Sequence, residues 1–160
     1  MPAGARELEP EEQIRALITR YFMALDRRDF DSIERCFASD ATAWYDREYG
    51  PGRDAIVAYL RTAMSRWKAT AHLGSNVEIV IDDAVARGRV DAVAYLVSAQ
   101  PGSENARIRV RGLRYADTFA LADGRWVFTR RERLATWSFD IDGRDLTGID
   151  SAVSPPPPPT

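Results

Sequence analysis

Residues 106–121 read ARIRVRGLRYADTFAL, and this stretch decides the fold class. Arginines alternate with apolar residues through its first half, which is the period-two pattern of a β-strand. At 16 residues it is far longer than the usual strand of about five or six. Strands this long twist so much that their sheet must curl. We therefore expect a curved sheet with a hollow side.

Similar stretches lie on both sides of it. Residues 84–99 come before it and residues 125–137 after it, and residues 77–82 show the same alternation further upstream. The turn signals between these stretches are Asp82-Asp83, Pro101-Gly102 and Asp123-Gly124. Gly112, inside the longest run, favours a bulge or bend. The order predicts a meander of antiparallel strands.

Three helical segments precede the strands. The first starts at Pro10, and its apolar residues recur at steps of three and four: Ile14, Leu17, Ile18, Tyr21, Phe22 and Leu25. Residues 29–37 predict a short second helix, and a third carries an apolar face made by Ile56, Tyr59, Leu60, Ala63, Met64 and Trp67. Between the last two helices, residues 41–45 favour a short strand. We predict one α+β domain in which a cone-shaped, curved antiparallel (mixed) sheet packs on three N-terminal helices.

Composition limits the partners and cofactors. The 160 residues are 45% hydrophobic and 29% charged, with a formal net charge of -2, so nucleic acid and anionic membranes are not expected partners. Cys36 and His72 are the only cysteine and histidine. One of each is too few for the usual transition-metal sites, and we expect neither a metal nor another cofactor.

The two ends differ from the middle. Residues 1–10 predict a flexible N-terminus without the apolar run of a signal peptide, and we expect a cytoplasmic protein. The folded domain is expected over residues 11–140. Residues 141–160 form a predicted tail with five consecutive prolines, more typical of a loose extended segment than of a ligand for a proline-recognising module.

Several segments together resemble a known family. They read YFMALDRRDFD (21–31), CFASDATAWY (36–45), GRDAIVAYL (52–60), AHLGSN (71–76), GLRYADTF (112–119) and DGRW (123–126). They resemble the nuclear-transport-factor-2-like superfamily, in particular its SnoaL-like branch, over residues 11–137. The resemblance implies an α+β barrel domain. That superfamily contains dehydratases, isomerases, cyclases, oxygenase small subunits and plain binding proteins.

Within it, the pattern is similar to scytalone dehydratase and the bile-acid 7α-dehydratases. The resemblance implies that Asp26, in the first helix, hydrogen-bonds His72 at the start of a strand. It also implies catalytic roles for Tyr45 and Tyr21. Leu25 stands where scytalone dehydratase has a tyrosine, and no second histidine exists in the chain.

Without the resemblance, the residues themselves support the pairing of Asp26 with His72 only in part. Asp26 borders the apolar stripe of the first helix, and a carboxylate that orients an imidazole leaves the other ring nitrogen free to exchange a proton. A solvated Asp26 paired with Arg27, and a structural His72, are the ordinary alternatives.

Further aromatic and charged residues are expected to bind substrate, to pack in the core or to lie on the surface. The expected substrate-binding residues are Trp44, Tyr115, Phe22 and Trp67. Cys36 is expected to be a buried thiol. The row Arg107, Arg109 and Arg111, like the run Arg130-Arg131-Glu132-Arg133, predicts a surface that keeps the sheet soluble or meets a partner subunit. Residues 140–145 resemble a calcium loop but lack its glycine and glutamate positions.

These observations predict a cofactor-independent lyase or isomerase. Its substrate would be a hydrophobic cyclic hydroxy-carbonyl compound, such as a polyketide or a steroid-like metabolite. A non-catalytic ligand-binding protein and a small subunit of a ring-hydroxylating oxygenase are the alternatives. Residues 92–97 are apolar on both strand faces, so we also expect a homodimer or higher homo-oligomer formed through the outer face of the sheet.

Overall fold

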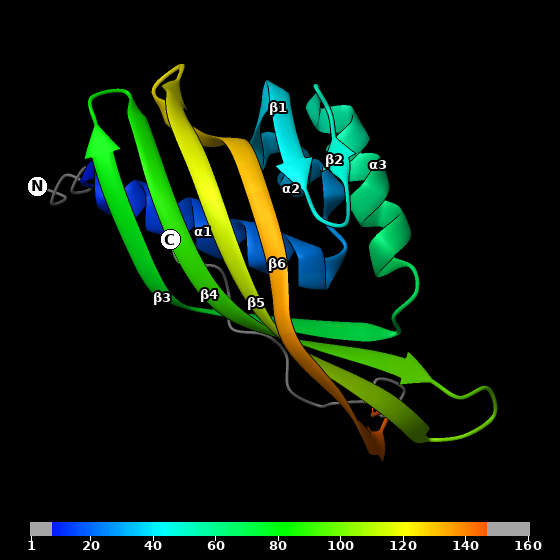
Figure 1. Cartoon of the computed structure of the whole chain (residues 1–160). Helices are drawn as coiled ribbons and strands as arrows, with labels where there is room; N and C mark the ends of the chain where they lie inside the picture. Colours follow the sequence, from blue (N-terminus) through cyan, green and yellow to red (C-terminus); the bar gives the residue numbers. More distant parts are fainter. Residues whose placement is uncertain (1–7, 147–160) are drawn as a thin grey trace, which may run out of the picture.

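The computed structural model describes residues 8–146 (Figure 1). The helices are α1 (Pro10–Arg27), α2 (Phe30–Cys36) and α3 (Arg53–Met64), and two short strands lie between the last two: β1 (Phe37–Trp44) and β2 (Glu48–Tyr49). Four long strands follow: β3 (Ala69–Asp82), β4 (Val85–Ala99), β5 (Asn105–Ala122) and β6 (Arg125–Arg144). The predicted α+β class, with helices before a meander of long strands, is confirmed.

The strands form one mixed sheet in the order β2-β1-β6-β5-β4-β3. Only β1 and β6 pair in parallel, whereas every other neighbouring pair is antiparallel. Edge strands β2 and β3 do not pair with each other, so the sheet curves without closing. The barrel implied by the resemblance is therefore an open, curved sheet.

The helices cover one side of this sheet. Figure 1 shows the long strands bending midway, with α1 crossing behind them and α3 beside β1 and β2. All six predicted stripe positions of α1 are buried. The helix ends where Arg28 adopts the left-handed conformation at φ 60°, and the Asp29 side chain then caps α2 by accepting a hydrogen bond from the Ser32 amide.

Strand β6 is longer than predicted. It continues past Trp137 to Arg144, because the segment compared with a calcium loop is a β-strand. Its carboxylates alternate along the strand and pair with arginines of β5: Asp140 with Arg109 at 2.8 Å, and Asp142 with Arg107 at 2.7 Å. These cross-strand ion pairs extend the ladder beyond the helical layer.

The prediction that residues 130–133 form a polar surface is wrong at Arg131. Its side chain is fully buried on the helical side of the sheet, and a guanidinium nitrogen lies 3.5 Å from the carboxylate of buried Asp117. Four aromatic rings surround the guanidinium, with centroids 4.0–5.3 Å from its central carbon: Tyr21, Phe22, Tyr115 and Phe128. The charge is therefore stabilised by ring faces as well as by a carboxylate.

The opposite side of the sheet carries exposed apolar residues. Leu73, Val93, Gly112 and Trp137 form one row across β3 to β6. A side chain at Gly112 would collide with the Trp137 ring, and the register shifts after Gly112, as expected for a bulge.

Among residues 8–146, no helix has the length and apolar character needed to cross a membrane.

We predict that Asp117 makes stability depend on pH. Burial raises its pKa from 3.8 to about 7, although the Arg131 charge opposes this rise. The folded chain therefore holds a proton that the unfolded chain releases between about pH 4 and pH 7, and stability falls as pH rises through this window. Asp117→Asn removes the titration. Relative to wild type, the variant should gain about 2 kcal/mol in unfolding free energy from pH 5 to pH 7.

Urea unfolding at pH 5, 6 and 7 measures this difference. Asp123→Asn is the matched control, because Asp123 is an exposed residue of the β5–β6 turn. An Asp117→Asn variant whose stability changes with pH as steeply as that of wild type would contradict the prediction.

Candidate active site

Asp26 links the end of α1 to the start of β3. Its Oδ1 lies 2.7 Å from Nδ1 of His72 and accepts a hydrogen bond from the Thr70 hydroxyl at 2.9 Å. Its Oδ2 accepts a hydrogen bond from the backbone amide of His72, also at 2.9 Å. Three donors on one strand therefore hold a single carboxylate on a helix.

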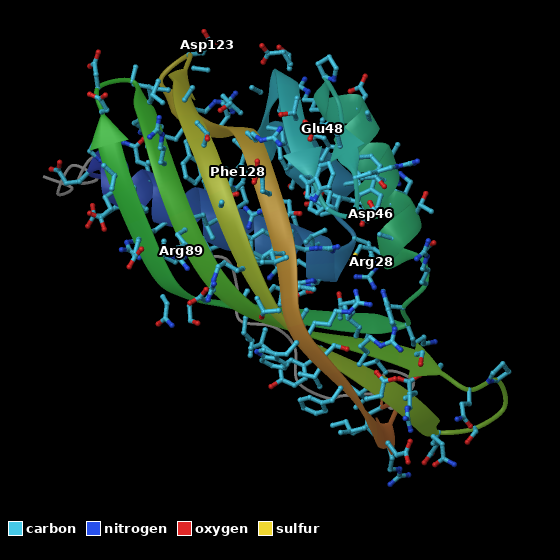
Figure 2. All side chains as sticks on the ribbon, viewed as in Figure 1. Arg28, Asp46, Glu48, Arg89, Asp123 and Phe128 are labelled. Carbon is cyan, nitrogen blue, oxygen red and sulfur yellow. The ribbon has the colours of Figure 1, made fainter. Side chains whose placement is uncertain are left out.

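Arg28 supports the Asp26 carboxylate indirectly, through the Thr70 hydroxyl. In Figure 2 it lies at the end of α1, toward the connection between α3 and β3. Its guanidinium donates to the Thr70 hydroxyl at 2.8 Å and to the carbonyl oxygens of Leu25 and Trp67. Because the Thr70 oxygen accepts from Arg28, its one hydroxyl proton is directed to Asp26.

These contacts keep Asp26 ionised. Its partial burial favours the neutral acid and would raise the pKa. The hydrogen bonds from the His72 ring and amide, the charge of His72 and the Thr70 hydroxyl outweigh burial, and the pKa of Asp26 is lowered. An ionised carboxylate only accepts hydrogen bonds, so Nδ1 of His72 carries the proton. Nε2 has no hydrogen-bond partner within residues 8–146.

Phe22 fixes the plane of the imidazole. The two rings are nearly parallel, at 9°, with centroids 6.0 Å apart. Gly74, two residues after His72 on β3, leaves room for this arrangement, since a Cβ there would lie 2.8 Å from the Phe22 ring. The His72 side chain is only 5% exposed, while that of Asp26 is 25% exposed.

His72 lines a cavity of about 270 Å³ between α3 and the sheet. Its walls combine apolar and cationic side chains: Tyr59, Ala63, Met64, Arg66, Trp67, Ala94, Leu96, Arg109, Arg111, Leu113 and Arg133. His72 therefore lies at the wall of a partly open cavity whose other walls come from α3 and strands β4, β5 and β6.

The other residues predicted for the site lie at different depths. Trp67 lines the cavity, and Phe22 reaches it only through His72. The hydroxyls of Tyr21 and Tyr45 hydrogen-bond each other at 2.9 Å in the core. Neither tyrosine lines the cavity.

Two further predicted substrate-binding residues also lie outside the cavity lining. Tyr115 packs on Arg131, and Trp44 is 46% exposed. Adjacent positions of a strand face opposite sides, so the inward turn of Tyr45 puts Trp44 outside.

Sequence reasoning missed Tyr59 and the arginines. Tyr59 was placed on the apolar face of the third helix, and the structure puts its ring on Tyr45, with centroids 4.9 Å apart, at the cavity wall. In the row predicted to lie on a solvent or partner surface, Arg107 is exposed, whereas Arg109 and Arg111 are half-buried and line the cavity, so the prediction is corrected at these two positions. The signal was the shared phase of Arg111 and apolar Leu113.

The described residues contain no group of three or more His, Cys, Asp or Glu side chains arranged to hold a metal ion. Cys36 is buried, as predicted, and burial raises the pKa of its thiol to about 11. That thiol stays protonated at neutral pH, which suits packing rather than nucleophilic chemistry.

Comparison with solved structures supports the fold. A protein of Novosphingobium aromaticivorans, provisionally named a scytalone dehydratase, superposes with a TM-score of 0.71 at 24% identity, covering 89% of this chain and 95% of that one. A hexachlorocyclohexane dehydrochlorinase (LinA-type3) of Novosphingobium barchaimii gives a TM-score of 0.72 at 16% identity, covering 91% and 94%. At these identities the likeness is one of fold.

Sequence comparison identifies the family. An uncharacterized protein of Mycobacterium tuberculosis, Rv2910c, is 28% identical over 127 residues, which are 78% of this chain and 84% of the relative. The sequence model of the SnoaL-like domain matches residues 6–132. That match covers most of the 160 residues, and the chain belongs to the SnoaL-like domain family.

Proposed function

We propose that this protein is a lyase or isomerase that transfers protons without a cofactor, most simply a dehydratase. The observation that carries the proposal is the His72 imidazole at the cavity wall, with Nδ1 held by the Asp26 carboxylate at 2.7 Å and Nε2 unbonded among the described residues. A histidine held in this way is a general base that can return its proton as an acid.

The first step is proton removal. Nε2 of His72 takes a proton from the carbon next to a carbonyl group, and the electron pair moves onto the carbonyl oxygen as an enolate. The imidazolium that forms is stabilised by the ionised carboxylate of Asp26. Tyr59, at the cavity wall, is the proposed donor to the enolate oxygen. Its ring rests on Tyr45, which Tyr21 anchors through the hydroxyl pair, so these two tyrosines act as positioning residues.

The second step releases the leaving group. The enolate electrons re-form the carbonyl and generate a carbon–carbon double bond as the neighbouring C–O bond breaks. The departing hydroxide takes the proton from Nε2 and leaves as water, which restores neutral His72. In a substrate without this hydroxyl, return of the proton to a different carbon gives isomerisation by the same residues.

The cavity favours a compact substrate. Its volume of about 270 Å³ is below the roughly 300–1,000 Å³ typical of pockets for drug-sized ligands. A cyclic hydroxy-ketone with one or two rings fits this volume better than a four-ring steroid.

We predict that Asp26 and His72 act as one catalytic unit. Asp26→Asn and His72→Gln should each lower turnover of cyclic β-hydroxy-ketones by roughly two orders of magnitude or more, the scale of lost general-base catalysis. The double variant should be little worse than the worse single variant. Mass spectrometry of a β-hydroxy-ketone panel follows the loss of water. Circular dichroism checks that each variant is folded.

Asp91→Asn is the control, because Asp91 lies on β4 and pairs with Arg114 outside the cavity. It should retain wild-type turnover. Full activity of Asp26→Asn, or single effects that multiply in the double variant, would rule out the catalytic pair. A ligand that binds wild-type protein and Asp26→Asn equally and is never converted would instead favour the binding-protein alternative.

We further propose that copies of the chain associate through the outer face of the sheet. The large exposed apolar residues that support this lie on β3, β4 and β6: Leu73, Tyr95, Trp137 and Phe139. The Trp137 and Phe139 rings are nearly parallel, with centroids 6.0 Å apart, and they give this face a flat apolar area.

Light scattering at micromolar concentration should therefore give at least twice the mass of the 18.0 kDa chain. Phe139→Glu should shift the population toward monomer because it places a charge in the proposed contact. A monomeric wild-type protein would contradict the proposed assembly.

A further inference from the structure

We propose that the substrate carries a carboxylate group and that Arg111 and Arg133 bind it across the cavity from His72. This inference rests on the proposed function and names its substrate class. It starts from the chemistry of the cavity wall, which the proton-transfer steps leave unused.

The cavity is strongly cationic. Four arginines line it, Arg66, Arg109, Arg111 and Arg133, and none of its lining residues is acidic. A cavity built only for a neutral hydrophobic compound has no use for several guanidinium groups. Burying unpaired charge costs free energy, so such groups are expected where a ligand supplies the opposite charge.

The surroundings of the four arginines differ, and Arg66 is exposed to solvent. Arg109 forms a two-point contact with Asp140, at 2.8 and 3.0 Å, so its charge is already balanced. Arg111 forms no hydrogen bond or ion pair within the described part of the chain. Arg133 donates one long hydrogen bond, 3.4 Å, to the carbonyl oxygen of Tyr45, and its Nε is buried without an acceptor. Arg111 and Arg133 therefore have unused donors.

Mutual repulsion adds to this imbalance. Burial lowers the pKa of Arg111, and the neighbouring charges of Arg109 and Arg133 lower it further. The charge of Asp140 acts in the opposite direction but is engaged by Arg109. A carboxylate bound between Arg111 and Arg133 would relieve the repulsion and satisfy the planar guanidinium donors.

The sheet register places this anion site relative to the base. His72 pairs with Ala94 on β4, and Ala94 pairs with Arg111 on β5, so the three residues form one row on the same face. Neighbouring strands lie about 4.8 Å apart, which puts the backbones of His72 and Arg111 roughly 10 Å apart. Only the small side chain of Ala94 stands between them. The row therefore leaves space for one ring between base and cation.

Binding measurements test the proposal without requiring turnover. The probes are 4-oxocyclohexane-1-carboxylate and its neutral carboxamide, which share the ring and ketone but differ in charge. Isothermal titration calorimetry on wild type and Asp26→Asn should give a dissociation constant for the carboxylate at least about tenfold lower than for the amide. Added salt should weaken binding of the carboxylate only.

Arginine variants locate the effect. Arg111→Gln should reduce the preference for carboxylate over amide at least about fivefold, and Arg111→Lys, which keeps the charge, should retain part of it. Arg107→Gln is the matched control. Arg107 lies on the same strand as Arg111, in the same phase, but it pairs with Asp142 and lies outside the cavity. This control should bind both probes as wild type does.

Equal binding of the two probes by wild type, or a preference that survives in both Arg111→Gln and Arg133→Gln, would overturn the inference. If neutral hydroxy-ketones are dehydrated while the carboxylate preference is absent, the inference fails and the proposed function stands. If the preference is present and no hydroxy acid or hydroxy-ketone is converted, the anion site stands and the proposed function fails.

Discussion

The carboxylate of Asp26 is the contact on which the site depends. It lies in the last turn of α1 and accepts hydrogen bonds from a hydroxyl, an amide and a ring nitrogen of β3. The helical layer and the edge of the sheet are thereby held together at the point where the hollow opens. The same three bonds lower the pKa of Asp26 and fix the proton on Nδ1 of His72. One carboxylate therefore joins the helix to the strand and orients the imidazole.

A second charged pair, Arg131 and Asp117, is buried in the part of the hollow that aromatic side chains fill. Arg131 and Asp117 face each other under α1, inside a group of aromatic rings, and neither side chain contacts solvent. Two residues further along β6, Arg133 reaches the cavity instead. The period of two along β6 puts both arginines on the inner face, one in the core and the next at the cavity. The proposed ligand site lies in the part of the hollow lined by Arg111 and Arg133, which keep unused donors among the described residues.

Part of this arrangement was predictable from the sequence, for identifiable reasons. The stripe of α1 and the period-two runs are direct consequences of helix and strand geometry, and they gave the fold class correctly. The proximity of Asp26 and His72, 46 positions apart, was implied by the family resemblance and not by spacing. No local pattern in the chain indicates which residue of β3 meets the end of α1.

The positions of Arg111 and Arg131 do not follow from their charge, because charged side chains usually lie at the surface. Alternation shows which residues of a strand share a face, but it does not show which face is hollow until the helical layer is positioned. Arg111 and Arg131 both fall on that inner face. The extension of β6 was missed because residues 141–160 were assigned to a tail, whereas Asp140 and Asp142 pair with arginines on the next strand.

The most direct measurement of the central claim is the ¹⁵N nuclear magnetic resonance spectrum of the imidazole. His72 is the only histidine, so labelling with ¹⁵N-histidine gives the two ring nitrogens of one residue. For the neutral form of the ring, the account predicts a proton on Nδ1 and an unprotonated Nε2 in wild type. It predicts loss of this preference in Asp26→Asn. A wild-type ring that carries its proton on Nε2, or the same mixture of tautomers in both proteins, would contradict the account.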